Sequence, residues 1–213
     1  MPTVTTWSNV SVLIQSALAS AIAISGITKA SPAVVSHAGS DPSNGAYVLV
    51  TATGMRQVDG RVFRVASSTT GSFALEGLDS SAFDTFESGS FQVITFGTSL
   101  ATATNMTASG GDFEFEDTTT IHINRRTQIP TVASPAKFDF TNIWDPADAG
   151  LVALKEASDA QAQRAVHIAF PNGRRALFTG YIGATLLPTG EAQRKVETPV
   201  TITMFGSPTV YTT

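Results

Sequence analysis

The sequence contains no cysteine among its 213 residues, so disulfide bonds, thiolate metal ligands and a cysteine nucleophile are all excluded. Charged residues are also scarce, at 14% of the chain, and the acids outnumber the bases to give a net charge of −4. Binding of nucleic acid through its phosphates needs clustered lysine and arginine, and this charge balance argues against it. Because the chain has no cysteine, the fold must be stabilised by packing and hydrogen bonds.

One long apolar run, from Val10 to Ile24, lacks the features of a secretory signal or a membrane span. No lysine or arginine precedes it, because the first basic residue is Lys29. We therefore expect no membrane association, and synthesis in a reducing cytoplasm. Polar residues also interrupt the run, at Ser11, Gln15, Ser16 and Ser20.

Short alternating runs of apolar and polar residues recur between turn signals, which is typical of an all-β protein. A period of two with one apolar face predicts half-buried strands, and we expect at least eight. The apolar region through Gly26 fits either a helix or a pair of strands. The clearest alternations set Phe113 and Phe115 against Glu114 and Glu116, Phe138 and Phe140 against Lys137 and Asp139, and Val166, Ile168 and Phe170 against Ala165, His167 and Ala169.

Turn signals divide the chain into three expected units. Residues 1–26 form a strand segment of the larger C-terminal domain, residues 27–89 a small inserted β module, and residues 90–213 a β-sandwich or barrel. One flanking helix is expected over residues 146–160, with Asp145 as N-cap and Pro146 in the first position. Its single apolar stripe predicts that it lies across the outside of the sheet.

No catalytic constellation is recognisable, so we expect neither enzyme activity nor a cofactor or metal. The three histidines, His37, His122 and His167, lack the spacing of metal ligands, and the last two are expected on sheet surfaces. The sequence also contains no nucleophile elbow and no phosphate-binding loop.

The sharpest acidic feature is the cluster Asp112, Glu114, Glu116 and Asp117. Glu114 and Glu116 project from one strand face about 7 Å apart, a separation compatible with a glycosidase pair or a calcium site. A solvated strand face is the simpler interpretation, and we favour it.

The C-terminal half has a distinctive order of elements: the predicted helix Asp145-Pro146 to Ala160, the strand His167-Ile168-Ala169-Phe170 with the turn Pro171-Asn172-Gly173, the strand Phe178-Thr179-Gly180-Tyr181-Ile182-Gly183 and the closing strand Val196 to Pro208. In this order, over about residues 91–208, it resembles the major tail tube proteins of long-tailed phages with non-contractile tails. The segments Gly26-Ile27-Thr28-Lys29-Ala30, Asp59-Gly60-Arg61-Val62-Phe63 and Phe73-Ala74-Leu75-Glu76-Gly77 carry a second resemblance, over residues 26–89, to a small β module found in many phage virion proteins.

The tail tube resemblance implies a β-sandwich or barrel whose subunits close into hexameric rings, and rings that stack into a hollow tube. Phage DNA would leave through the lumen without specific binding, and a tape measure protein would fill it beforehand. The other implied partners are the tail terminator and tail-tip proteins. The protein would be assembled in the host cytoplasm and reside in the virion tail, with the extra module on the outside of the tube.

The resemblance also implies roles for particular residues. In the family a long hairpin orders against the neighbouring ring, and here the corresponding stretch is 117–136. Glu114 and Glu116 become candidates for the lumen wall, where their charge would repel DNA. The stacking residues within the hairpin would be Ile121, Ile123, Arg125, Arg126 and Ile129.

Two other function classes compete with this interpretation. A tail-tip or fibre protein that binds the host surface is suggested by the 26–89 module and by Trp7, Tyr47 and Trp144, although single aromatics are more often core residues. An enzyme that uses Glu114 and Glu116 is the least favoured.

Overall fold

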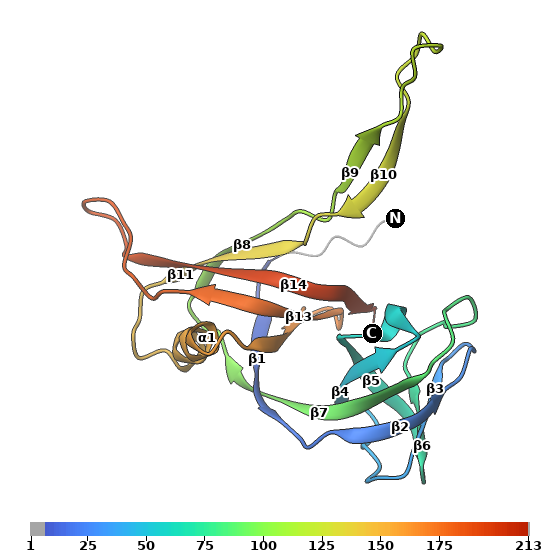
Figure 1. The fold of residues 1–213 in the computed structure, drawn as a ribbon. Helices are drawn as coiled ribbons and strands as arrows, with labels where there is room; N and C mark the ends of the chain where they lie inside the picture. Colours follow the sequence, from blue (N-terminus) through green and yellow to red (C-terminus); the bar gives the residue numbers. More distant parts are fainter. Residues whose placement is uncertain (1–6, 213) are drawn as a thin grey trace.

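The computed structural model describes residues 7–212, which form a mainly β structure with one α-helix (Figure 1). This confirms the predicted fold class. The apolar N-terminal region forms a pair of strands, β1 (Ser11–Leu18) and β2 (Ile22–Ile27). The other strands are β3 (Val34–His37), β4 (Tyr47–Thr53), β5 (Arg61–Thr69), β6 (Ser72–Leu75), β7 (Ser88–Ser99), β8 (Ala103–Ser109), β9 (Phe113–Asp117), β10 (Gln128–Ala133), β11 (Lys137–Ile143), β12 (Gln163–Ala169), β13 (Arg175–Ala184) and β14 (Glu197–Tyr211).

Six strands close into a barrel in the order β2-β3-β6-β5-β4-β7, because β7 pairs with both β4 and β2. The barrel takes β2 and the first half of β7 from the two flanks of the segment expected as the 27–89 module. Phenylalanine and β-branched residues fill its interior, as expected for strands that bury one face. Its fully buried residues include Val35, Val48, Phe63, Phe73 and Phe91.

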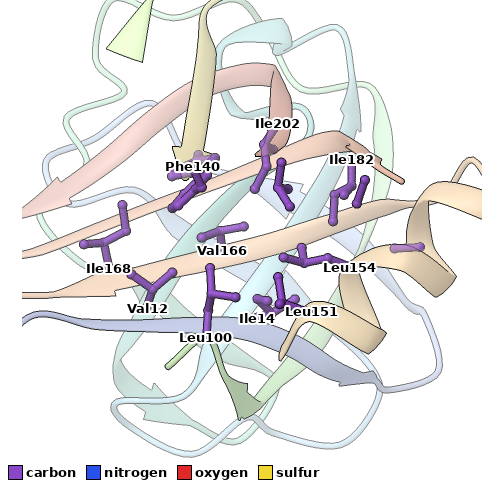
Figure 2. Close-up of a cluster of buried hydrophobic side chains, with 14 residues drawn as sticks. Val12, Ile14, Leu100, Phe140, Leu151, Leu154, Val166, Ile168, Ile182 and Ile202 are labelled. Atoms are coloured by element: carbon purple, nitrogen blue, oxygen red, sulfur yellow. The ribbon is translucent and has the colours of Figure 1, made fainter. Parts of the chain in front are cut away.

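The second half of β7 leaves the barrel and pairs with β1, which opens a second antiparallel sheet. That sheet continues from β1 in the order β12-β13-β14-β11-β8. Its inner face and the helix enclose a separate apolar core, in which Val166, Phe140 and Ile202 meet Leu151 and Leu154 (Figure 2). The chain therefore has two cores, joined through the continuous strand β7.

The helix α1 (Ala149–Asp159) packs mainly on β13, with its buried stripe toward the sheet. It begins later than the predicted residue 146, because Asp148 is the N-cap, and its Oδ1 accepts a hydrogen bond from the Leu151 amide at 2.8 Å. Asp145 instead accepts from the Ala147 amide and shapes the preceding turn. Within residues 7–212, no helix is long and apolar enough to cross a membrane.

The barrel packs against the outer face of the second sheet and forms a third apolar cluster. Several hydrogen bonds cross this joint. Among them, Thr179 Oγ1 donates to the Gly60 carbonyl at 2.7 Å, and the Arg64 amide donates to the Tyr211 hydroxyl at 2.7 Å. The prediction that β12 is half-buried was therefore wrong, because the barrel covers its second face. For the same reason His167 is buried, and not on a sheet surface as predicted.

Candidate assembly surfaces

A long β-hairpin projects from the ends of β8 and β11, away from both cores (Figure 1). We call residues 112–134, which contain β9 and β10, the arm. These two strands form a sheet of their own that pairs with no other described strand. At its base Gly110 and Gly111 adopt positive φ, and a Cβ on Gly110 would lie 2.4 Å from the Pro135 carbonyl oxygen.

Hydrogen bonds within the arm define its shape. The Thr118 amide donates to the Thr127 carbonyl, and Thr131 Oγ1 donates to the Glu114 carbonyl, so the two strands are tied along their length. Near the tip, hydrogen bonds from the Thr119 side chain and amide lower the pKa of Asp117. The arm is thus an ordered hairpin whose side chains have few contacts with the rest of the subunit.

The apolar side chains of the arm are exposed to solvent. Phe113 and Phe115 are 58% and 60% exposed, so the prediction that their strand is half-buried was wrong for the single subunit. The alternation is present, but no element in the described part of the chain packs on β9 and β10 to bury either face. A two-stranded hairpin of this kind is marginally stable alone, which favours a partner molecule as its cover. Other exposed apolar residues of the arm are Ile121, Ile123, Ile129 and Val132.

The structure brings the predicted stacking residues together on this arm. Ile121, Ile123, Arg125 and Arg126 lie in the tip between β9 and β10, and Ile129 lies opposite Glu116 in the strand pairing. Neither arginine forms an ion pair with a described residue. The sequence reasoning missed Phe113 and Phe115 as surface residues, since their alternation looks like that of a core strand.

The candidate chemical groups do not form a reaction centre. Glu114 and Glu116 lie on one exposed face of β9, and His122 lies in the exposed arm tip. His37 is enclosed in the barrel between the rings of Phe73 and Phe91. Within residues 7–212, no three His, Asp or Glu side chains are grouped as metal ligands would be.

A second surface is a groove along β8, the edge strand of the second sheet. β8 pairs with β11 on one side, and its other side faces the groove. The volume of the groove is about 630 Å³. Its lining residues are uncharged and come from the start of β1, the end of β7 and β8 itself: Trp7, Asn9, Val10, Ser11, Val12, Ser99, Leu100, Ala101, Ala103, Thr104, Asn105 and Met106.

A third surface lies at the end of β11 opposite the arm, and we call it the Trp144 end. The Trp144 indole donates to the Leu186 carbonyl at 2.9 Å, and the Trp144 amide donates to the Val196 carbonyl at 2.9 Å. These bonds tie three chain segments together at a place where four apolar side chains remain exposed. They are Ile143, Trp144, Leu187 and Val196.

The three aromatic residues suggested for host binding do not share one exposed surface. Trp7 packs against Phe170, with ring centroids 5.3 Å apart and the rings tilted by 55°. Tyr47 is enclosed in the joint between barrel and sheet, where Arg175 donates to its hydroxyl. Trp144 lies at the end of β11 opposite the arm.

Comparison with known families shows to which family the chain belongs. The sequence model of the phage tail tube protein family matches residues 53–213, from the end of β4 to the last residue. The chain belongs to the phage tail tube protein family. The match includes the arm, every strand of the second sheet except β1, and the barrel strands β5, β6 and β7. The tail tube resemblance therefore extends further toward the N-terminus than residue 91. Among curated proteins, none matches the chain.

Membership in the tail tube family makes the protein a structural component of the phage tail. The family consists of structural, non-enzymatic proteins that assemble with copies of themselves into a tube. The exposed apolar arm, the free edge of β8 and the Trp144 end are therefore the candidate contacts between subunits.

Proposed function

We propose that the protein is the major tail tube subunit of a long, non-contractile phage tail, in which hexameric rings stack into a hollow conduit for DNA ejection. The observation that carries this proposal is the arm, which presents exposed isoleucines and phenylalanines on a hairpin that no other element of residues 7–212 covers. A lone soluble protein gains nothing from such a surface, whereas a subunit of a stack buries it.

Ring closure is supported by the edge of the second sheet. β8 offers unpaired backbone groups along the groove, and an exposed edge strand invites pairing with another chain. In a closed ring every subunit presents its β8 edge to one neighbour and covers the β8 edge of the other neighbour, so no β8 edge remains free. Lateral contacts through β8 and axial contacts through the arm would then build a tube.

The inter-ring contact is assigned to Ile121, Ile123, Arg125, Arg126 and Ile129. Full burial of one isoleucine contributes about 1.5–3 kcal/mol, so three could contribute several, although ordering of the hairpin offsets part of that gain. The two arginines at the tip have no ion-pair partner in the described part of their own subunit and can meet carboxylates of the next ring.

Glu114 and Glu116 are assigned to the lumen wall. Their carboxylates share one face of β9, and like charge would keep transiting DNA from binding. Assembled tubes of the Glu114→Lys, Glu116→Lys double variant should retain double-stranded DNA at low salt, and wild-type tubes should not. Outward-facing carboxylates in a structure of the tube would contradict this assignment.

The remaining proposals concern location and partners. The barrel that contains residues 27–89 would lie on the outer surface of the tube, away from the lumen. The tube would enclose a tape measure protein during assembly in the host cytoplasm, and tail terminator and tail-tip proteins would cap its ends.

Electron microscopy of concentrated or seeded protein tests the proposal. We expect hollow tubes from the wild-type chain and a folded, non-polymerising subunit from the Ile121→Asp, Ile123→Asp double variant. The matched control is Thr120→Asp, Asn124→Asp, which adds the same charge to the exposed arm tip but removes no apolar side chain. A monomer or trimer at every concentration would instead indicate an adhesin.

A further inference from the structure

We propose that the tip of the arm docks on the Trp144 end of a second copy of this chain. The inference deepens the proposed function and rests on it, because only stacked subunits bring the two surfaces together. Nothing in the family match assigns a receptor for the arm on this chain.

The two surfaces lie at opposite ends of one strand. β11 begins at Lys137, two residues after Pro135 at the base of the arm, and ends at Ile143, immediately before Trp144. The arm also points away from the body of its own subunit (Figure 1), which keeps its tip from reaching its own Trp144 end. A contact between them is therefore head-to-tail between copies, and such a contact extends into an open stack where the rotation between copies does not close a ring.

The apolar groups on the two surfaces complement one another. Ile121 at the arm tip is 97% exposed, and Ile123 is 45% exposed. On the receiving side Leu187 is 65% exposed, beside a tryptophan whose indole is already fixed to the Leu186 carbonyl. A fixed aromatic surface loses little conformational freedom on binding, which suits it as the anchor of an interface.

The charges of the two surfaces are also complementary. The tip between β9 and β10 carries Arg125 and Arg126 and no acidic residue. At the Trp144 end, Asp145 and Asp148 both precede α1, and neither forms an ion pair in the described part of the chain.

The other charges near the Trp144 end neutralise one another. Arg194 lies 3.4 Å from Glu191, and Lys195 lies 2.8 Å from Glu197, so both cations of the β13–β14 loop are already paired. The two aspartates therefore remain as a net negative surface that can receive the arginines of the arm.

The groove along β8 is the alternative receptor, and it fits the arm tip less well. None of its lining residues is charged, so it offers Arg125 and Arg126 no counter-charge. It also follows the free sheet edge, which suits lateral contact within a ring better than contact between rings.

Disulfide trapping tests the docking, since the chain has no cysteine to interfere. In assembled tubes of the Ile123→Cys, Leu187→Cys double variant, mild oxidation should produce a ladder of oligomers on a non-reducing gel. A ladder is expected because each copy contributes one arm and one receptor. The matched control is Ile123→Cys, Thr104→Cys, which places the second thiol in the groove and should give no ladder.

A charge exchange provides an independent readout. Replacing Arg125 and Arg126 with Glu should raise the protein concentration needed for polymerisation at least about tenfold, because like charges then face each other. Adding Asp145→Lys should restore part of that loss, whereas Asp145→Asn, which leaves no positive charge, should restore less. Thermal melting of the unassembled subunits verifies that each variant is folded.

The outcomes separate the two proposals. Tubes without the Leu187 ladder, or with a ladder through Thr104 instead, would overturn the docking and leave the tube function standing. Failure of the wild-type chain to form tubes under any condition would overturn both.

Discussion

His167 links the stability of the subunit to pH, because its imidazole is buried between the barrel and the second sheet. The rings of Tyr47 and Phe96 lie 5.1 and 5.3 Å from it. Burial, together with the positive charge of Arg175, lowers the pKa of His167 from 6.5 to about 4. The folded state therefore holds a neutral imidazole where the unfolded chain takes up a proton.

We predict that stability falls as the pH drops from about 6.5 to about 4, by up to ~3 kcal/mol from this residue. The sign follows from the lowered pKa: between these pH values the unfolded state binds more protons than the folded state. Urea unfolding of the unassembled subunit at pH 7 and pH 4.5 measures the effect. His167→Gln should lose this component, and the exposed His122→Gln should keep it.

Acidic groups also titrate near the lower end of that range, so only the difference between variants is informative. The hydrogen bond from Arg64 lowers the pKa of Glu76, and the stability from this pair is lost as the pH falls below the usual carboxyl range. That loss is common to the wild type and both variants and cancels. An identical pH dependence in His167→Gln and the wild type would contradict the assignment.

Gly60 supplies a second prediction, at the turn before β5, where the barrel contacts the second sheet. Its φ is +66°, and a Cβ there would come within 2.5 Å of the Phe205 ring. We expect Gly60→Ala to lower the free energy of unfolding by about 1–3 kcal/mol, from backbone strain and the displaced ring. The control is Gly26→Ala in β2, where φ is not positive and no neighbouring atom lies within 4 Å; it should cost little.

The arm behaves as an independent element, so its removal should spare the fold. We predict that replacing residues 112–133 with an Asn-Gly turn leaves the melting temperature of the subunit within about 4 °C, or about 1 kcal/mol, of the wild type. The reason is that the Gly111 amide already donates to the Ser134 carbonyl at 3.1 Å, so the cut ends are adjacent.

The same excision should abolish tube formation, as judged by electron microscopy and by sedimentation. A shortened subunit that unfolds would show that the arm stabilises its own subunit. A shortened subunit that still forms tubes would place the inter-ring contact elsewhere.

At the scale of elements, the sequence predicts strands well because their alternation is local. Turn residues such as Asn172-Gly173 place the hairpin between β12 and β13, and Asp59-Gly60 comes just before β5. The predicted start of the helix was wrong, because the structure uses Asp148 as the N-cap and not Asp145. In the helix that begins at Ala149, Gly150 packs so closely against the Ser99 carbonyl that a Cβ at this position would lie 2.6 Å from its oxygen.

Which layer covers a strand was not predictable from its period. The pattern of Phe113 and Phe115 is the same as that of Phe138 and Phe140, yet the first pair is exposed and Phe140 is buried. The difference depends on whether another element packs on the strand, which is a property of the tertiary structure. The arm residues of the candidate site came from the family resemblance, and the Trp144 end was visible only in the structure.

For the whole molecule, an outer position of the barrel predicts where a peptide tag is tolerated. A short epitope inserted between Ser43 and Asn44, in the exposed loop before β4, should leave tube formation intact and bind antibody along the tube wall. The control insertion, between Asn124 and Arg125 at the arm tip, should block polymerisation. Tubes that assemble with the Ser43 insertion but bind no antibody would contradict the outer position.

The narrow base of the arm has a mechanical consequence for an assembled tail. Within residues 7–212, the arm joins the rest of the subunit through Gly110, Gly111 and the segment at Pro135, whereas the body of the subunit is a pair of filled β cores joined by β7. A stack of such subunits would have stiff parts, formed by the subunit bodies, and flexible connections between them, formed by the arms. When fluid drag bends the tail, the arms would bend and the subunit bodies would not. The tube could then flex while its lumen kept the same cross-section.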